Sequence, residues 1–166
     1  MTVLAILISL LFAQAPSTLD LLRQSAVTEC VSVDYEFSTM VSGFKTVGNG
    51  TVQIQGNAYH MTGNGIEIYC DGSTTWLIDE NSKEVLIESA DTKDAGVLAN
   101  PILLLMNLEE SSITYKVQGD HILLTMPDRT ELDIKIKNMV TLSSKKSEAF
   151  RPPIEFSGQW VVTDLR

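Results

Sequence analysis

The sequence predicts a mainly β protein with a few helices, and two features of the chain lead to that prediction. Most of the chain consists of short segments in which apolar and polar residues alternate, separated by turns rich in Gly and Asn. Helical patterns occur only near residues 19–28 and 100–106. Short strands at this spacing are typical of a sandwich, a barrel or a strongly curved sheet.

The clearest strand pattern covers residues 31–38. Val31, Val33, Tyr35 and Phe37 are apolar there, and the residues between them are polar. Such a strand has one apolar face and one solvated face. The same alternation recurs at residues 51–55, 59–61, 66–68, 76–78, 85–87, 115–117, 122–124 and 132–137, with turn signals at 48–50, 56–57, 63–65, 71–72 and 118–120.

The first expected helix runs from about residue 19 to residue 28. Ser17 or Thr18 can cap its N-terminus, because both side chains accept hydrogen bonds from the first free backbone amides of a helix. Helical spacing places Leu19, Leu22 and Ala26 on one face. This face is expected to pack against the sheet.

The second expected helix is short and apolar on nearly all sides. Asn100 provides a cap residue and Pro101 the first helical residue, and the next five residues, 102–106, are all large and apolar. A helix of this kind must be buried, and the apolar face of the sheet is the surface available. Residues 91–96 before it are polar and loop-like, so the helix is a candidate lid on a flexible lead.

Length and charge limit the possible classes of protein. The chain has 166 residues, which is enough for one domain with a substantial core. Its formal net charge is -9, from 21 acidic and 12 basic residues. This charge argues against nucleic-acid binding and against electrostatic docking on anionic membranes.

Residues 3–12 form an apolar run of signal-peptide length. Small residues follow, so cleavage is expected after Ala13 or after Ala15, with a signal peptide at 1–13 and one mature domain at 14–166. The alternative is a buried or membrane-anchoring N-terminal helix. The first cysteine, Cys30, comes well after either cleavage point, so we expect the mature chain to carry no lipid of its own.

Residues that could carry chemistry are few. Cys30 and Cys70 could form a disulfide in an oxidising compartment or be two small buried residues. His60 and His121 lie in separate strands without metal-ligand spacing and are expected to be exposed. The sequence has no nucleophile elbow, HExxH pair or Walker loop. We therefore expect no catalytic residues, no metal, no cofactor and no enzymatic activity.

Four stretches of the chain carry a family resemblance, in matching order. They are residues 48–55 (GNGTVQIQ), 70–79 (CDGSTTWLID), 100–106 (NPILLLM) and 163–166 (TDLR). The second is the most specific, because it contains the pattern DGxTxW. Together the four stretches resemble the periplasmic outer-membrane lipoprotein carrier proteins, the LolA family.

The resemblance implies an incomplete antiparallel β-barrel, a curved sheet with helices covering its concave apolar face. It implies a periplasmic carrier that takes acylated lipoproteins from an inner-membrane transporter of the ABC type. The carrier would shield their acyl chains and deliver them to the outer membrane, where an acceptor could receive them. We expect a monomer that works without a cofactor.

The resemblance also suggests where acyl chains would bind. The cavity residues are expected to be Val52, Ile54, Tyr59, Met61, Ile66, Ile68, Trp76, Ile78, Val85 and Ile87, and the lid residues Pro101, Leu103, Leu104 and Met106. One departure concerns gating: the best-studied members carry an early-strand Arg, whereas residues 52–59 here contain no Arg or Lys. Two alternatives remain, a lipid- or lipoprotein-sensing domain of the same fold and a structural β domain with a filled core.

Overall fold

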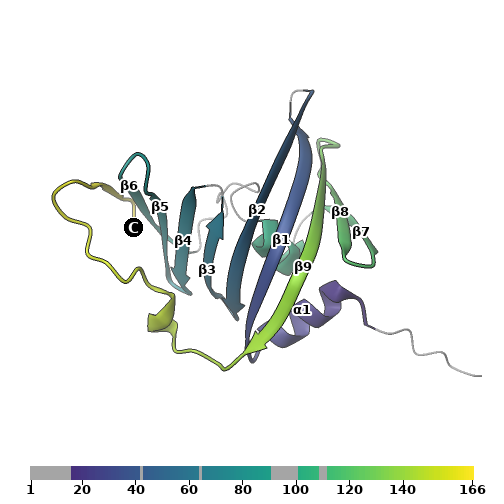
Figure 1. The fold of residues 1–166 in the computed structure, drawn as a ribbon, viewed down its shortest axis with the longest axis horizontal. Coiled ribbons are helices and arrows are strands. Elements are labelled where there is room, and N and C mark those ends of the chain that lie inside the picture. The colour runs from purple at the N-terminus through teal and green to yellow at the C-terminus, as the bar shows by residue number, and fades with distance from the viewer. Residues whose placement is uncertain (1–15, 42, 64, 91–100, 109–111) are drawn as a thin grey trace, which may run out of the picture.

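Ten strands lie side by side in one open, curved sheet, which confirms the mainly β prediction (Figure 1). The computed structural model describes residues 16–41, 43–63, 65–90, 101–108 and 112–166. The strands are β1 (Cys30–Val41), β2 (Phe44–Gln55), β3 (Ala58–Gly63), β4 (Ile66–Asp71), β5 (Thr74–Asp79), β6 (Glu84–Ser89), β7 (Thr114–Gln118), β8 (His121–Thr125), β9 (Glu131–Leu142) and β10 (Val161–Asp164). The helices are α1 (Thr18–Ala26), α2 (Pro101–Met106) and the 3-10 helix η2 (Ser147–Phe150).

The strand order is β10-β6-β5-β4-β3-β2-β1-β9-β8-β7. Strands β1 to β6 form successive antiparallel pairs, and β9 returns to pair with the free side of β1. The C-terminal strand β10 pairs with β6 in parallel and closes that edge. The sheet is thus built from two runs of neighbouring strands that meet at the long β1–β9 pair.

The two faces of the sheet follow from the register. Val33, Val52, Met61, Ile68 and Leu77 are partners across successive strands, so their side chains share one face, which we call the inner face. The helices α1 and α2 pack on this face and complete the main core with it. In Figure 1 they lie behind the sheet. The opposite, outer face is polar over β1, β2 and β9.

The helix α1 forms as the sequence predicts. Ser17 is the cap residue: its hydroxyl accepts from the amide of Asp20, and the Asp20 carboxylate accepts from the amide of Ser17. The predicted face of Leu19, Leu22 and Ala26 is buried. The helix ends at Ala26, slightly earlier than expected.

The helix α2 is six residues long and begins at Pro101, as expected for a proline at the first position. Ile102 and Leu105 have no exposed surface, and Leu108 just beyond the helix is buried as well. The proposed cap Asn100 and the lead at 91–96 lie outside the described residues, as does the signal peptide with both cleavage points. Within the described residues, no helix is long and apolar enough to span a bilayer.

Candidate functional site

A cavity of about 180 Å³ lies between α2 and the inner face of the sheet. Leu103 and Met106 of α2 form one wall, and Tyr59 and Cys70 of the sheet form part of the other. The remaining lining residues come from nearby turns and strand ends: Gly56, Asn57, Gly72, Thr75, Glu88, Ala90 and Asn107. The helix α2 thus supplies one wall of the cavity.

The walls of this cavity are largely uncharged. Burial raises the pKa of Tyr59 to about 12, so its hydroxyl stays protonated. Burial also raises the pKa of the Cys70 thiol, which donates to the carbonyl oxygen of Asn57 over 3.5 Å. Among the lining residues, Glu88 supplies the one carboxylate. The wall is mixed, because apolar side chains such as Leu103 and Met106 lie beside polar ones such as Asn57 and Thr75.

An arginine on α1 holds α2 in place. The Nε atom of Arg23 donates a hydrogen bond to the carbonyl oxygen of Leu105, over 2.9 Å. This carbonyl lies in the last turn of α2, where backbone oxygens lack partners within the helix and carry partial negative charge. The guanidinium also lies 5.9 Å from the ring centre of Tyr115 on β7. Arg23 thus joins α1, α2 and the β7 edge.

The cavity is small compared with typical ligand sites, which enclose about 300 Å³ or more. The rest of the inner face is filled by side chains of the main core, including Ile102 and Leu105 of α2. The structure is therefore a closed arrangement. With α2 in this position, the cavity is too small for a chain-like ligand.

The structure divides the ten expected cavity residues between the two faces. Six lie on the inner face: Val52, Ile54, Tyr59, Met61, Ile66 and Ile68. Of these, Tyr59 lines the cavity beneath α2. The other four pack on the outer face in a separate cluster with Tyr69, Phe156 and Trp160: Trp76, Ile78, Val85 and Ile87.

The division of these residues follows from the register of β4, β5 and β6. Tyr69, Trp76 and Ile87 are partners across these strands, as are Ile68, Leu77 and Leu86. The expectation of one common face was therefore wrong for the four residues of β5 and β6. Their inner-face neighbours are Leu77 and Leu86. Both faces are apolar here because the C-terminal segment covers the outer one.

The expected lid residues all lie on α2, but their roles differ. Leu103 and Met106 line the cavity, whereas Leu104 is half-buried against the main core and Pro101 is buried. The sequence-based prediction missed the most deeply buried positions, Ile102 and Leu105. It also missed Arg23, because no local pattern links two residues 82 positions apart.

Cys30 and Cys70 do not form the disulfide considered from the sequence; both are free and buried. Cys70 is the partner of Tyr59 and lies on the inner face. Cys30 precedes the inner-face residue Val31 and packs on the outer face with Ala58 and Phe150. Because the sheet lies between the two thiols, a bond would require rearrangement of the strands.

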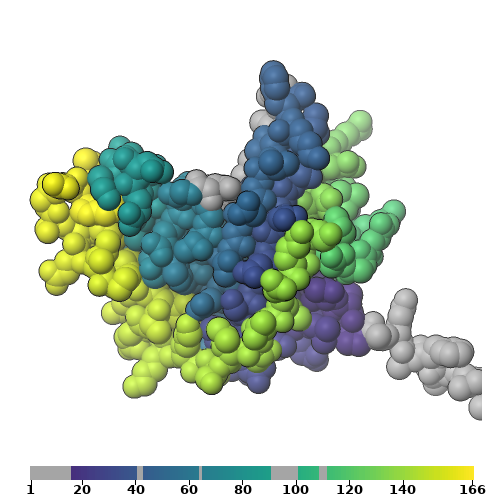
Figure 2. All heavy atoms as spheres, viewed as in Figure 1, coloured from purple at the N-terminus to yellow at the C-terminus, as the bar shows by residue number. Residues whose placement is uncertain are grey.

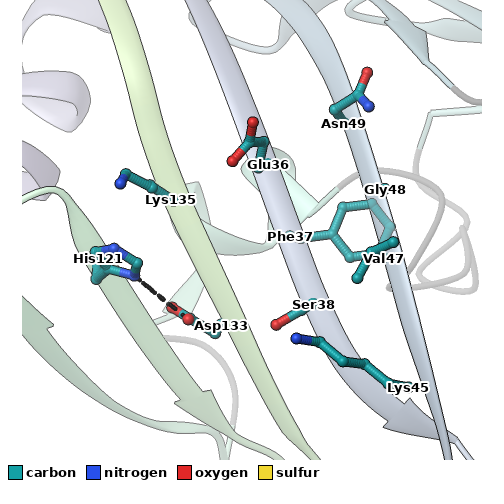
Figure 3. A pocket seen from close by; sticks show the side chains of 10 residues that line it. All are labelled: Glu36, Phe37, Ser38, Lys45, Val47, Gly48, Asn49, His121, Asp133 and Lys135. Carbon is teal, nitrogen blue, oxygen red and sulfur yellow. Dashed lines mark hydrogen bonds and ion pairs between the residues drawn. The ribbon is translucent and has the colours of Figure 1, made fainter.

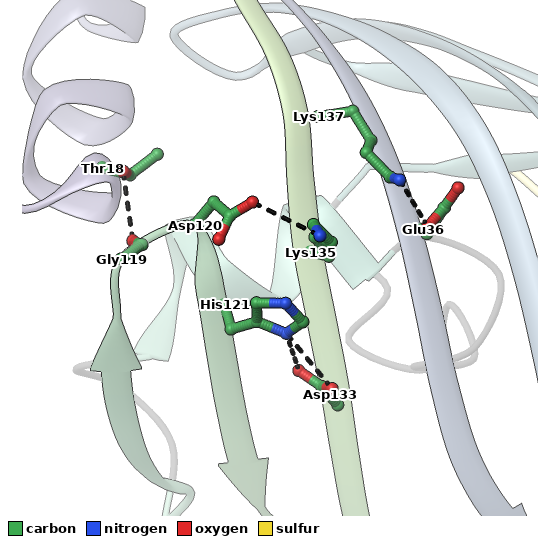
Figure 4. Close-up of polar contacts among 8 residues, drawn as sticks. All are labelled: Thr18, Glu36, Gly119, Asp120, His121, Asp133, Lys135 and Lys137. Atoms are coloured by element: carbon green, nitrogen blue, oxygen red, sulfur yellow. Dashed lines mark hydrogen bonds and ion pairs between the residues drawn. The ribbon is translucent and has the colours of Figure 1, made fainter.

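A second hollow, of about 420 Å³, lies on the outer face beside β1, β2, β8 and β9 (Figure 3). Charged side chains in and around it pair with one another (Figure 4). These pairs are Lys137 with Glu36 at 2.9 Å, Lys135 with Asp120 at 3.6 Å, and His121 with Asp133 at 3.1 Å. The hollow thus resembles a solvated, self-neutralised surface more than a binding site.

Both histidines are half-buried and paired with carboxylates, rather than exposed as expected. The Nε2 atom of His60 lies 2.7 Å from Glu67, and the His60 ring stacks on Tyr69 with ring centres 4.1 Å apart. His121 pairs with Asp133. No group of three or more metal-ligating side chains occurs within the part of the chain that the structure describes.

Comparison with known families and proteins adds no assignment. No family model matches the chain, and none of the curated proteins matches it either. The geometry of the inner face and α2 therefore carries the functional argument.

Proposed function

We propose that the chain is a periplasmic carrier of acylated lipoproteins. In this proposal the curved sheet is an incomplete antiparallel barrel whose inner face receives acyl chains released from the inner membrane and delivers them to the outer membrane. The observation that carries the proposal is α2, a six-residue apolar helix that covers a cavity on an apolar sheet face. The protein acts by binding and release and is not an enzyme.

The energetics of transport support this role. Each CH₂ group withdrawn from water contributes about 0.8 kcal/mol, so acyl chains cannot cross an aqueous compartment unshielded. The carrier must also release its cargo. The free energy of acyl-chain binding must therefore be offset by contacts that re-form when the acyl chain leaves. In the closed structure Ile102 and Leu105 occupy the inner face. If an acyl chain replaces these side chains, one apolar contact is exchanged for another and the cargo can leave again.

Gating in this proposal depends on Arg23. Its hydrogen bond to Leu105 favours the closed position of α2, and cargo entry would have to break it. The arginine comes from α1 and not from an early strand. Residues 52–59 contain no Arg or Lys that could hold the lid closed. In this proposal the hydrogen bond of Arg23 to α2 is the latch that holds it closed instead.

A structural β domain with a filled core is the second candidate. One observation favours it: the cavity measures only about 180 Å³ in the closed structure. In that case α2 would be ordinary core and would not move. The two candidates differ in whether the inner face can be exposed without unfolding the sheet.

The deciding experiment is a release assay with the mature protein. Spheroplasts or inner-membrane vesicles that hold a newly made lipoprotein are incubated with the protein, and the soluble fraction is examined. A carrier yields a soluble one-to-one complex of protein and lipoprotein. If no lipoprotein is released and no apolar fluorescent probe binds, the carrier proposal is wrong.

Leu104→Asp tests whether α2 takes part. Leu104 is half-buried, so a carboxylate there should detach α2 from the core while the sheet remains folded. Cargo uptake should be lost with an unchanged β circular-dichroism spectrum. Leu21→Asp is the matched control, because Leu21 is an exposed helical leucine on α1. Global unfolding of the Leu104 variant would favour the filled core.

A further inference from the structure

The hairpin of β1 and β2 extends beyond the strands on both sides of it. β2 pairs with β3 only from Thr51 onward, and β1 pairs with β9 only as far as Thr39. The hairpin end, from Met40 to Lys45, is therefore a two-stranded ribbon without further strand neighbours among the described residues. Val47 lies at its base, opposite Ser38, which β9 flanks on the other side. Figure 2 shows it projecting from the body of the molecule.

The ribbon carries large apolar side chains in solvent. Met40 is 54% exposed, Phe44 77% and Val47 67%, and Phe44 is the most exposed large apolar residue that the structure describes. We call these three residues the ribbon tip. Met40 and Val47 point toward the outer face and Phe44 toward the inner face, as the register with Lys45, Ser38 and Val41 requires. The tip is thus apolar on both sides.

The ribbon is firmly held at its base. The hydroxyl of Thr39 is buried and donates to the carbonyl oxygen of Glu131 over 2.7 Å. Gly43 has a φ of 83°, a left-handed conformation that glycine adopts without strain and that suits the tight reversal. The tip is therefore presented on a preformed projection.

The ribbon differs in charge from the rest of the chain. Residues 38–47 contain one cation, Lys45, and no carboxylate, whereas the chain as a whole has a formal net charge of -9. Both apolar sides of a narrow projection can be buried at once only by a partner that surrounds it. A flat protein partner would cover only one side. The boundary between lipid headgroups and acyl chains is such a partner, and a lysine beside the apolar residues can reach the phosphates.

We propose that the ribbon tip docks the protein on a phospholipid bilayer. Phe44 enters the interface together with Met40 and Val47, and Lys45 remains among the phosphates. The driving force is apolar burial, because the acidic body of the protein disfavours electrostatic attraction to anionic lipid. Docking concerns the outside of the molecule and does not depend on the carrier proposal. It would hold equally for a domain with a filled core.

The test is flotation of the mature, cargo-free protein with phosphatidylcholine vesicles. Phe44→Ser should lower the partition coefficient at least about tenfold, because fully burying a Phe side chain shifts an equilibrium by one to two orders of magnitude. Val27→Ser is the matched control, since Val27 is 70% exposed just after the C-terminal end of α1, away from the ribbon. This control should bind like the unaltered protein.

A spectroscopic measurement reports on the tip directly. In Phe44→Trp, the added tryptophan should show blue-shifted emission with vesicles and quenching by brominated lipid, after subtraction of the signal from Trp76 and Trp160. The docking proposal is overturned if the unaltered protein does not bind vesicles, if Phe44→Ser binds as well as Val27→Ser, or if the new tryptophan stays in water. Lipoprotein release can succeed or fail independently of these results.

Discussion

The Nε atom of Arg23 donates to the carbonyl oxygen of Leu105 over 2.9 Å, and this bond joins α1 to the last turn of α2. It is a polar contact between the two helices that cover the inner face. The packing of Ile102 and Leu105 of α2 against the main core is apolar and carries little directional preference. The bond therefore gives the last turn of α2 a directional contact with α1, and its loss should loosen that helix first.

Arg23→Met should shift α2 toward an open position. The substitution keeps an apolar stem and removes the donor, and a hydrogen bond to a charged group contributes about 1.5–3 kcal/mol. The amides of residues 102–106 should exchange with solvent at least about tenfold faster, and binding of an apolar dye should increase. Arg129→Met is the control, because Arg129 lies in an exposed turn. Uniformly faster exchange across the sheet would instead indicate general destabilisation.

The two cysteines should report on the position of α2. Cys70 lines the cavity beneath α2, whereas Cys30 is buried on the other face against Phe150. Burial raises the pKa of both thiols, so both should react slowly with an alkylating reagent in the folded protein. In Arg23→Met, Cys70 should be labelled much faster and Cys30 should not. Peptide mass spectrometry separates the two sites, and equal acceleration at both would contradict the latch.

Local patterns predict much of this fold, because alternation and capping act over a few residues. The alternation at Val31, Val33, Tyr35 and Phe37 and the capping signal at Ser17 correspond to a strand and a helix start in the structure. The short apolar helix at Pro101 is also where the sequence places it. In these cases the chemistry that specifies the element lies within the element.

The distribution of residues between faces could not be predicted in the same way. In β5 and β6, Trp76 and Leu77 are both apolar, and so are Val85 and Leu86, so alternation does not identify the inner face. The outer face is apolar because Trp160, far along the chain, packs there. The hydrogen bond between Arg23 and Leu105 likewise joins two residues far apart in the sequence. Such contacts require the folded topology.

The assignment of faces can be tested with two buried isoleucines. Ile68 lies on the inner face and Ile78 on the outer face, with exposed fractions of 4% and 1%. Substitution of either by Ala should lower the free energy of unfolding by about 2–5 kcal/mol. Only Ile68→Ala should change the affinity for an apolar probe that enters beneath α2. Equal effects on probe binding would show that both faces, or neither, accept the probe.

Asp71 should make stability depend on acidity. Burial opposes ionisation of this side chain, which is only 3% exposed. The amides of Thr74 and Ser73, the Ser73 hydroxyl and the Arg151 guanidinium donate to the carboxylate and outweigh burial, so its pKa falls from 3.8 to about 2. A carboxyl group with a lowered pKa stabilises the fold above its unfolded pKa. That contribution is lost as the pH falls from about 4 to about 2.

Asp71→Asn should therefore lower the free energy of unfolding by about 2 kcal/mol at pH 7 and by much less near pH 2. Urea unfolding at several pH values measures this difference. Asp128→Asn is the matched control, because Asp128 accepts from the amide and hydroxyl of Thr130 in an exposed turn and should matter less. The Arg151 contact also anchors the C-terminal segment at 2.7 Å. Arg151→Ala should accordingly increase proteolytic cleavage after residue 151. If Asp71→Asn lowers the free energy of unfolding equally at all pH values, ionisation of Asp71 is not the cause.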